Sequence, residues 1–151
     1  MKILVSTTLF AIIGFNLMAQ TPQTNSATPA ATEKMTSTVF DWEKMHVETM
    51  PNGVRRTVFD TPTTTLEKAH CHITTLKPGA NSGAPRLHLQ EEIIIIKEGQ
   101  VEATFDGHKQ IAGPGSVIFF AANAVTCLRN AGDGPATYTV INYYPPAATK
   151  N

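Results

Sequence analysis

The chain has no excess of charge of either sign, since 12 lysines and arginines balance 12 aspartates and glutamates over 151 residues. A protein that binds nucleic acid through its phosphates needs a basic surface, so this balance argues against a nucleic-acid partner. Charged residues make up only 16% of the chain, below the roughly 25% that is usual in soluble domains. The hydrophobic share of 42% is nevertheless too high for a chain that is disordered throughout.

Cysteine is also scarce, because the sequence contains only Cys71 and Cys127. Two cysteines are too few for a disulfide-rich scaffold or for a cysteine-rich zinc module. An oxidising compartment would permit a bond between them only if their Cα atoms came within about 7 Å. The sequence favours two separate thiols.

A long hydrophobic run occurs only at the N-terminus. Lys2 precedes a mostly apolar stretch from Ile3 to Phe15, and Ala19 supplies a small residue at a cleavage point. This pattern is typical of a secretory signal peptide, and the stretch is shorter than the ~20 residues of a membrane span. We therefore predict a signal peptide over residues 1–19, a periplasmic or secreted protein, and no stable membrane anchor after cleavage.

The remainder divides by composition into a leader, a domain and a tail. Residues 20–38 are rich in Thr, Ala, Pro and Ser without apolar periodicity, which predicts a disordered leader. A folded domain is predicted over residues 39–146. Its last strand ends at Pro145 and Pro146, because proline cannot donate a hydrogen bond to a strand ladder. Residues 147–151 form a short tail.

The predicted domain consists of strands. Apolar and polar residues alternate over 101–106, as in a half-buried strand. Four consecutive isoleucines, 93–96, predict a strand that is covered on both faces. The stretch Val39–Val47 is read as an early strand. About eight to ten such runs, separated by turn residues, predict an all-β fold of the jelly-roll type, a double-stranded β-helix barrel.

The middle of the chain resembles the cupin superfamily, in particular its small single-domain members. The resemblance covers roughly residues 55–144 and implies a jelly-roll barrel around a ligand pocket. It rests on the spacing of turn residues, one histidine, one glutamate and one asparagine. The residues that carry it are Pro78, Gly79, His88, Glu92, Gly99, Gly115, Ser116 and Asn130.

The resemblance implies a divalent metal held by three histidines and a glutamate, but Arg86 and Thr126 occupy two of these four positions. Only His88 and Glu92 remain, and two ligands rarely hold such an ion. Arginine stays protonated and offers no lone pair. At ~4 Å and a dielectric constant near 20, its charge would repel a divalent ion by up to about 8 kcal/mol. These departures argue against Mn, Fe, Ni or Zn as a cofactor.

His70 and His72 share one face of a predicted strand, because side chains alternate along a strand. If that face pointed into the barrel, the two imidazoles could join His88 and Glu92 in a shifted metal site. The apolar residues Cys71 and Ile73 on the opposite face favour histidines that face solvent.

Arg86 has two alternative uses: an ion pair with Glu92, or bidentate binding of a ligand carboxylate or phosphate. The leading hypothesis is a binding domain for a small, anionic ligand that Arg86, His88, Glu92 and Thr126 contact, with a lost or weakened metal site. The second hypothesis is a metal-dependent enzyme of the dioxygenase, isomerase or aminohydrolase type. It would use His88 and Glu92 with His70 or His72. The third hypothesis is a homodimeric scaffold without a ligand. The fold itself carries no information on the substrate.

Overall fold

Ten strands make up most of the residues that the computed structural model describes, which are 33–146. They are β1 (His46–Met50), β2 (Gly53–Thr61), β3 (Lys68–Leu76), β4 (Arg86–Leu87), β5 (Glu92–Glu98), β6 (Val101–Phe105), β7 (His108–Ala112), β8 (Val117–Phe120), β9 (Val125–Asn130) and β10 (Ala136–Tyr144). The predicted signal peptide, the predicted tail and the predicted leader up to residue 32 lie outside the described residues. Within 33–146, no helix has the length and apolar character to cross a membrane.

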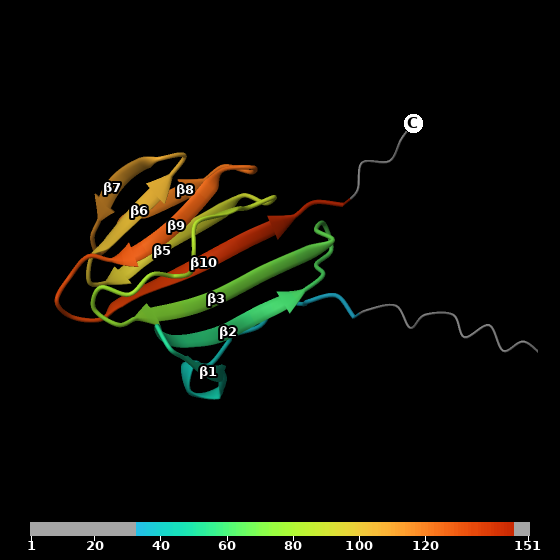
Figure 1. Ribbon diagram of the computed structural model, residues 1–151. Helices are drawn as coiled ribbons and strands as arrows, with labels where there is room; N and C mark the ends of the chain where they lie inside the picture. Colours follow the sequence, from blue (N-terminus) through green and yellow to red (C-terminus); the bar gives the residue numbers. More distant parts are fainter. Residues whose placement is uncertain (1–32, 147–151) are drawn as a thin grey trace, which may run out of the picture. The chain divides into compact units, whose positions relative to one another are not determined.

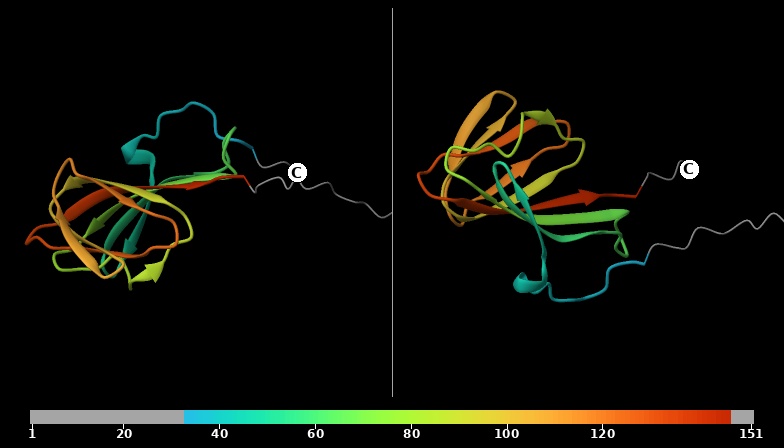
Figure 2. Two further views of the ribbon diagram at one scale, coloured as in Figure 1. Left: turned by 90° about the horizontal axis from the view of Figure 1, so that it is seen from above. Right: turned by 60° about the horizontal axis from the view of Figure 1, so that its bottom comes forward.

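The strands form two antiparallel sheets. The larger sheet has the order β1-β2-β3-β10-β5-β8, and the smaller has the order β4-β9-β6-β7. The last strand, β10, therefore lies in the middle of the larger sheet, between β3 and β5 (Figure 1). The two sheets curve around a shared interior (Figure 2). This arrangement confirms the predicted all-β barrel.

The hydrophobic core fills the space between the sheets, because alternate residues of each strand point inward. In β6, Val101 and Ala103 are buried while Glu102 and Thr104 are only half-buried, as the alternation predicts. The core cluster comprises Leu76, Ile94, Ile96, Val101, Ala103, Ala112, Phe120, Leu128, Ala136, Tyr138 and Val140.

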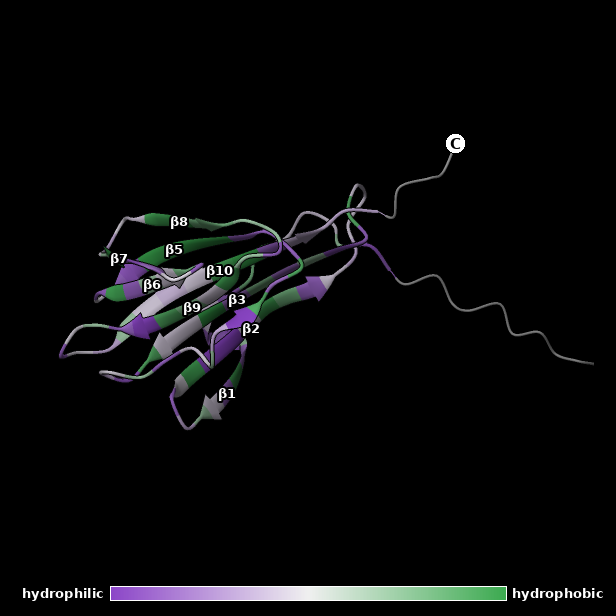
Figure 3. Ribbon diagram, turned by 45° about the horizontal axis from the view of Figure 1, so that its top comes forward, coloured by the Kyte–Doolittle hydropathy of each residue, from purple (hydrophilic) through white to green (hydrophobic). Residues whose placement is uncertain are grey.

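The isoleucine run of β5 is covered on one face only, so the prediction that both faces are covered was wrong. Ile94 is 2% exposed, whereas Ile95 is 41% exposed. The reason is that Ile95 points to the opposite face of the strand from Ile94 and Ile96, toward the outside of the larger sheet. On β8, Val117 and Phe119 are also exposed. Figure 3 shows the apolar character of both strands.

The stretch Val39–Val47 is not a continuous strand, so this prediction was wrong as well. A short 3-10 helix, η1 (Trp42–Lys44), interrupts it before β1 begins. The Asp41 side chain accepts a hydrogen bond of 3.1 Å from the Glu43 backbone N–H, which caps the turn. The Trp42 ring then lies 4.1 Å from the guanidinium carbon of Arg56, at a distance typical of a cation–π contact.

Cys71 and Cys127 are free thiols, as the sequence favoured. Cys71 lies on β3 of the larger sheet and Cys127 on β9 of the smaller sheet. Burial raises the pKa of the Cys71 thiol to about 11, so this group stays protonated at neutral pH.

Asn130, which belongs to the motif spacing, has a structural role. Its side chain is fully buried and donates hydrogen bonds to the backbone carbonyls of Leu76 at 3.1 Å and Gly134 at 2.8 Å. Its side-chain oxygen accepts a hydrogen bond of 3.0 Å from the Gly132 N–H. Asn130 therefore holds the turn between β9 and β10 against the end of β3.

Gly99, another motif residue, makes the turn between β5 and β6. Its φ of +75° lies in the left-handed region that side chains disfavour. A Cβ atom at this position would lie 2.5 Å from the carbonyl oxygen of Pro135 and 2.8 Å from the Cα of Ala136. Both the conformation and the close approach of the backbone require glycine.

We expect Gly99→Ala to lower the free energy of unfolding by about 2 kcal/mol or more, because strain and a backbone clash add together. The matched control is Gly107→Ala, where φ is +83° but nothing lies within 4 Å of the added Cβ. The control should cost only about 1 kcal/mol. Urea unfolding of both variants measures the difference, and equal losses would contradict the steric argument.

Candidate functional site

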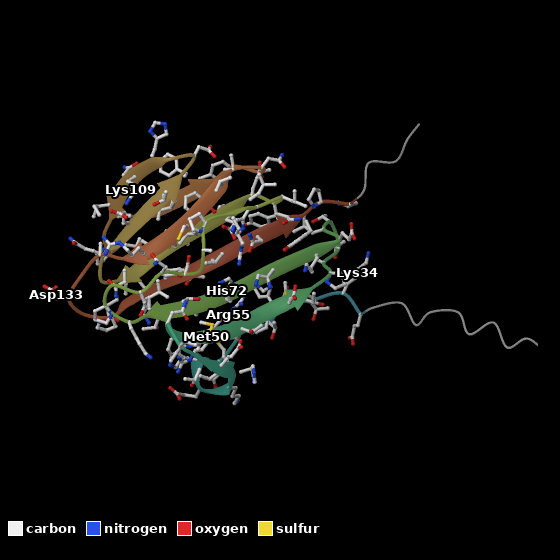
Figure 4. The ribbon with its side chains drawn as sticks, in the orientation of Figure 1. Lys34, Met50, Arg55, His72, Lys109 and Asp133 are labelled. Atoms are coloured by element: carbon white, nitrogen blue, oxygen red, sulfur yellow. The ribbon has the colours of Figure 1, made fainter. Side chains whose placement is uncertain are left out.

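A cavity of about 140 Å³ lies inside the barrel, beside the hydrophobic core, and polar side chains form much of its wall. Apolar residues such as Ile94 and Phe120 line the side that continues into the core. Met50, Arg55 and His72, from β1, β2 and β3, lie in a row across the larger sheet (Figure 4). The ionisable nitrogen and carboxylate side chains on the wall are Arg55, His72, Arg86, His88 and Glu92.

Strand register brings these residues together from distant parts of the sequence. In the larger sheet, Asn142 of β10 pairs with His70 of β3 on one side and with Glu92 of β5 on the other. Between β4 and β9 of the smaller sheet, Arg86 pairs with Thr126. Thr126 is 2% exposed and lines the cavity, so the two positions where the sequence departs from the cupin ligand pattern are direct neighbours.

Arg86, His88, Glu92 and Asn142 form one continuous chain of hydrogen bonds. The Nε of Arg86 donates to His88 Nε2 at 3.1 Å. Because arginine can only donate, Nε2 is the acceptor and the imidazole proton lies on Nδ1. This Nδ1 lies 3.2 Å from Glu92 Oε1, which also accepts a hydrogen bond of 3.0 Å from Asn142 Nδ2. The chain engages both ring nitrogens of His88.

The expected ion pair between Arg86 and Glu92 is not formed, and this alternative was wrong. His88 lies between the two groups and contacts both. The Glu92 side chain is 11% exposed and its neighbour Glu91 is exposed, so the predicted inward position of Glu92 is confirmed. The position of Arg86 at the outer strand β4 explains the outcome, because its guanidinium reaches His88 first.

Arg55, His70 and His72 form a second group. The Arg55 Nη2 lies 3.2 Å from His70 Nε2 and 3.1 Å from His72 Nδ1, and these two ring nitrogens are 3.0 Å apart. On its other side, His70 Nδ1 lies 3.3 Å from Asp60 Oδ1. The guanidinium therefore donates toward a ring nitrogen of the pair, and Asp60 ties the pair to the end of β2.

His72 faces the cavity, so the interpretation of His70 and His72 as a solvent-facing pair was wrong for His72. The apolar face of β3 that carries Cys71 is buried too, which means that both faces of this strand are covered here. Burial lowers the pKa of His72 to about 3, and the positive charges of Arg55, His70 and Arg86 add to this effect. The His72 imidazole is therefore neutral at physiological pH.

These residues do not fit the divalent metal that the resemblance implies. Among residues 33–146, no three His, Cys, Asp or Glu side chains are arranged to hold a metal ion. His88 Nε2, the nitrogen that a ligand would present, accepts a hydrogen bond from Arg86 instead. The facing nitrogens of His70 and His72 point at each other and at Arg55. A metal ion needs ligand atoms with lone pairs, and Arg55 and Arg86 in the cavity wall offer none.

Two residues of the site were missed from the sequence. Arg55 is adjacent to Arg56, and the alternation of a strand requires that one of the two point inward. The structure assigns this place to Arg55, while Arg56 lies on the outer face against Trp42. Asn142 shares the inward face of β10 with the buried residues Val140 and Tyr138, a signal that was available in the alternation of the last strand.

Removal of the Asn142 amide tests the hydrogen-bond chain. We expect Asn142→Ala to lower the free energy of unfolding by about 2 kcal/mol, because a buried carboxylate loses a donor. When Glu92 is already replaced by Gln, the further substitution Asn142→Ala should lower the free energy of unfolding by less. A double-mutant cycle of the two substitutions therefore measures their coupling. Additive losses from the two substitutions would show that the contact contributes nothing.

The neutral state of His72 predicts a pH dependence of stability. The folded pKa of about 3 lies below the ordinary value of 6.5, so the unfolded chain binds the proton first as the pH falls. The contribution of His72 to the free energy of unfolding is therefore fully present above pH 6.5. Below that pH it declines by at most about 1.4 kcal/mol per pH unit. Urea unfolding between pH 7 and 5 should show a smaller decline in His72→Gln. Substitution of the exposed His108 by Gln is the control, and equal slopes in all three proteins would contradict a lowered pKa of His72.

Several solved structures share this architecture. An RmlC-like cupin from Shewanella frigidimarina has a TM-score of 0.59 at 14% identity and covers 73% of this chain and 94% of its own. KdgF from Halomonas sp. has a TM-score of 0.60 at 17% identity and covers 74% and 97%. A cupin-superfamily sugar phosphate isomerase from Silicibacter pomeroyi has a TM-score of 0.56 at 21% identity and covers 72% and 77%. At such identities the similarity shows the fold alone.

The sequence comparison adds the family. No curated protein matches the chain. Residues 72–142, which run from β3 to β10 and include Arg86, His88, Glu92 and Thr126, match the family model described as a cupin domain. With the jelly-roll neighbours, this match confirms the resemblance read from the motif spacing. The chain contains a cupin domain over residues 72–142, within a fold that it shares with small cupins of known structure.

Proposed function

We propose that this cupin binds a small anion in its barrel, with guanidinium groups where related sites would hold a metal cation. The observation that carries the proposal is the hydrogen bond from Arg86 Nε to His88 Nε2. It places a permanent positive charge at the nitrogen that a metal would need. An arginine in this position attracts carboxylates and phosphates as a cation does, and it also supplies directed N–H donors.

The charge balance of the cavity supports an anionic ligand. Arg55 and Arg86 contribute two positive charges to the wall, while Glu92 contributes one negative charge. His72 adds none, because its pKa is lowered to about 3. The Nε of Arg55 is buried without a hydrogen-bond partner among the described residues. A buried donor of this kind favours an acceptor oxygen nearby.

We further propose that the protein acts in the periplasm or outside the cell and that its partner is a small molecule. The location rests on the apolar stretch after Lys2 and on Ala19 at the expected cleavage point. The partner class rests on the cavity together with the neutral overall charge, which gives no basic surface for nucleic acid.

Inorganic phosphate and acetate are the probes for the proposed anion site. At ten times its dissociation constant, a bound anion should raise the free energy of unfolding by about 1.4 kcal/mol. We expect this gain in the unchanged protein and its loss in Arg86→Gln. Arg129→Gln, which removes an arginine paired with Glu102 on the smaller sheet, should keep the gain. Urea unfolding with and without each anion measures all three proteins.

Two outcomes would overturn the proposal. One is the absence of any stabilisation by either anion in the unchanged protein. The other is stoichiometric Mn, Fe, Ni or Zn in the purified protein that disappears in His88→Ala. The second outcome would favour a metal-dependent enzyme in which His70 or His72 joins His88 and Glu92.

A further inference from the structure

The cavity at the arginines is the first of three spaces that share wall residues in sequence, here called the path. It adjoins a space of about 340 Å³, here called the mouth, whose wall includes Leu89, Gln90 and Tyr144. The mouth adjoins a surface groove of about 770 Å³, here called the outer groove, which the same three residues also line. The residues that the cavity and the mouth share are Arg55, His72, Arg86, His88 and Glu92.

The volumes bear on the size of the ligand. Sites for organic ligands usually measure about 300–1,000 Å³. The cavity, at about 140 Å³, is below this range, whereas the mouth and the outer groove fall within it. A ligand confined to the cavity would be little larger than an inorganic ion or acetate. A larger ligand held by Arg55 and Arg86 extends beyond the cavity, and the mouth is the neighbouring space that both arginines also line.

Charge changes sign along this path. The inner end carries Arg55 and Arg86 against a single carboxylate, Glu92. The outer groove carries three carboxylates and one lysine: Asp60, Glu67, Glu91 and Lys68. Lys68 lies 3.3 Å from Asp60 and compensates only that carboxylate. The far end of a ligand would therefore meet net negative charge, which opposes a second anionic group there.

The outer groove also offers apolar surface. Leu89 is 66% exposed and Tyr143 is 39% exposed, and both border the groove. Tyr144 lines both the mouth and the outer groove, and Lys68 Nζ lies 4.2 Å from the centroid of its ring. Apolar side chains beside a charged site provide binding energy to the uncharged part of a ligand.

We propose that the ligand is an elongated monoanion with an apolar tail, such as an aryl-alkyl carboxylate. Its anionic head binds at Arg55 and Arg86, and its uncharged tail lies along Leu89, Tyr143 and Tyr144. The inference rests on the proposed function for the head and adds the length, the polarity and the single charge of the ligand.

Isothermal titration calorimetry of the full chain with acetate, 4-phenylbutyrate and adipate tests this proposal. 4-Phenylbutyrate should bind about tenfold more tightly than acetate, a gain that corresponds to burial of roughly 60 Å² of apolar surface. Adipate has a comparable length but carries a second carboxylate, so it should bind no more tightly than acetate.

A matched pair of variants locates the tail. Leu89→Ser should remove most of the gain of 4-phenylbutyrate over acetate and leave acetate binding unchanged. Ile111→Ser removes a similar side chain that is 54% exposed on β7, away from the groove, and should leave both affinities unchanged. Leu89 is exposed, so neither substitution disturbs the core.

The outcomes separate this inference from the proposed function. If acetate binds but 4-phenylbutyrate binds no more tightly, or if its advantage survives in Leu89→Ser, the proposed tail site is wrong and the anion site stands. If adipate binds more tightly than 4-phenylbutyrate, the single charge is wrong. If none of the three carboxylates binds while phosphate stabilises the protein, the carboxylate ligand is wrong and the anion site stands. If phosphate fails too, the proposed function is overturned with it.

Discussion

The hydrogen bond between Arg86 and His88 determines the character of the whole site. A guanidinium can only donate, so His88 must accept at Nε2 and carry its proton on Nδ1. That proton then faces the carboxylate of Glu92, which also accepts a hydrogen bond from Asn142. One substitution relative to the cupin ligand pattern thereby converts a potential metal-binding group into a closed network, in which the only permanent cations belong to arginine side chains.

Arg55, on β2 of the larger sheet, also places a positive charge beside histidines of the site. Arg55 approaches both His70 and His72, and its charge helps to keep the half-buried His72 neutral. The site combines the charges of two arginines, a neutral His72 and one carboxylate that accepts hydrogen bonds, and this combination underlies the proposed anion site.

Local sequence patterns predicted the parts of the structure that depend on near neighbours. The alternation in β6, the turn at Gly99 and the inward position of Glu92 follow from strand geometry and glycine conformation, which act over a few residues. These patterns gave wrong predictions about the exposure of strand faces, because elements distant in sequence decide whether a face is covered. Ile95 is exposed because it points to the outer face of the larger sheet, and His72 lines the cavity because it points to the inner face.

By itself, the sequence determined the all-β fold, the cupin family and the loss of two metal ligands, because motif spacing and residue chemistry are properties of the chain. Only the tertiary structure decided what replaced the metal ligands. The partners of His88, the entry of Arg55 into the site and the role of Asn142 all depend on the register of strands that are far apart in sequence. A short turn fixes the register of neighbouring strands, but no such turn joins β10 to β3 or β5, so their register follows only from the folded sheet.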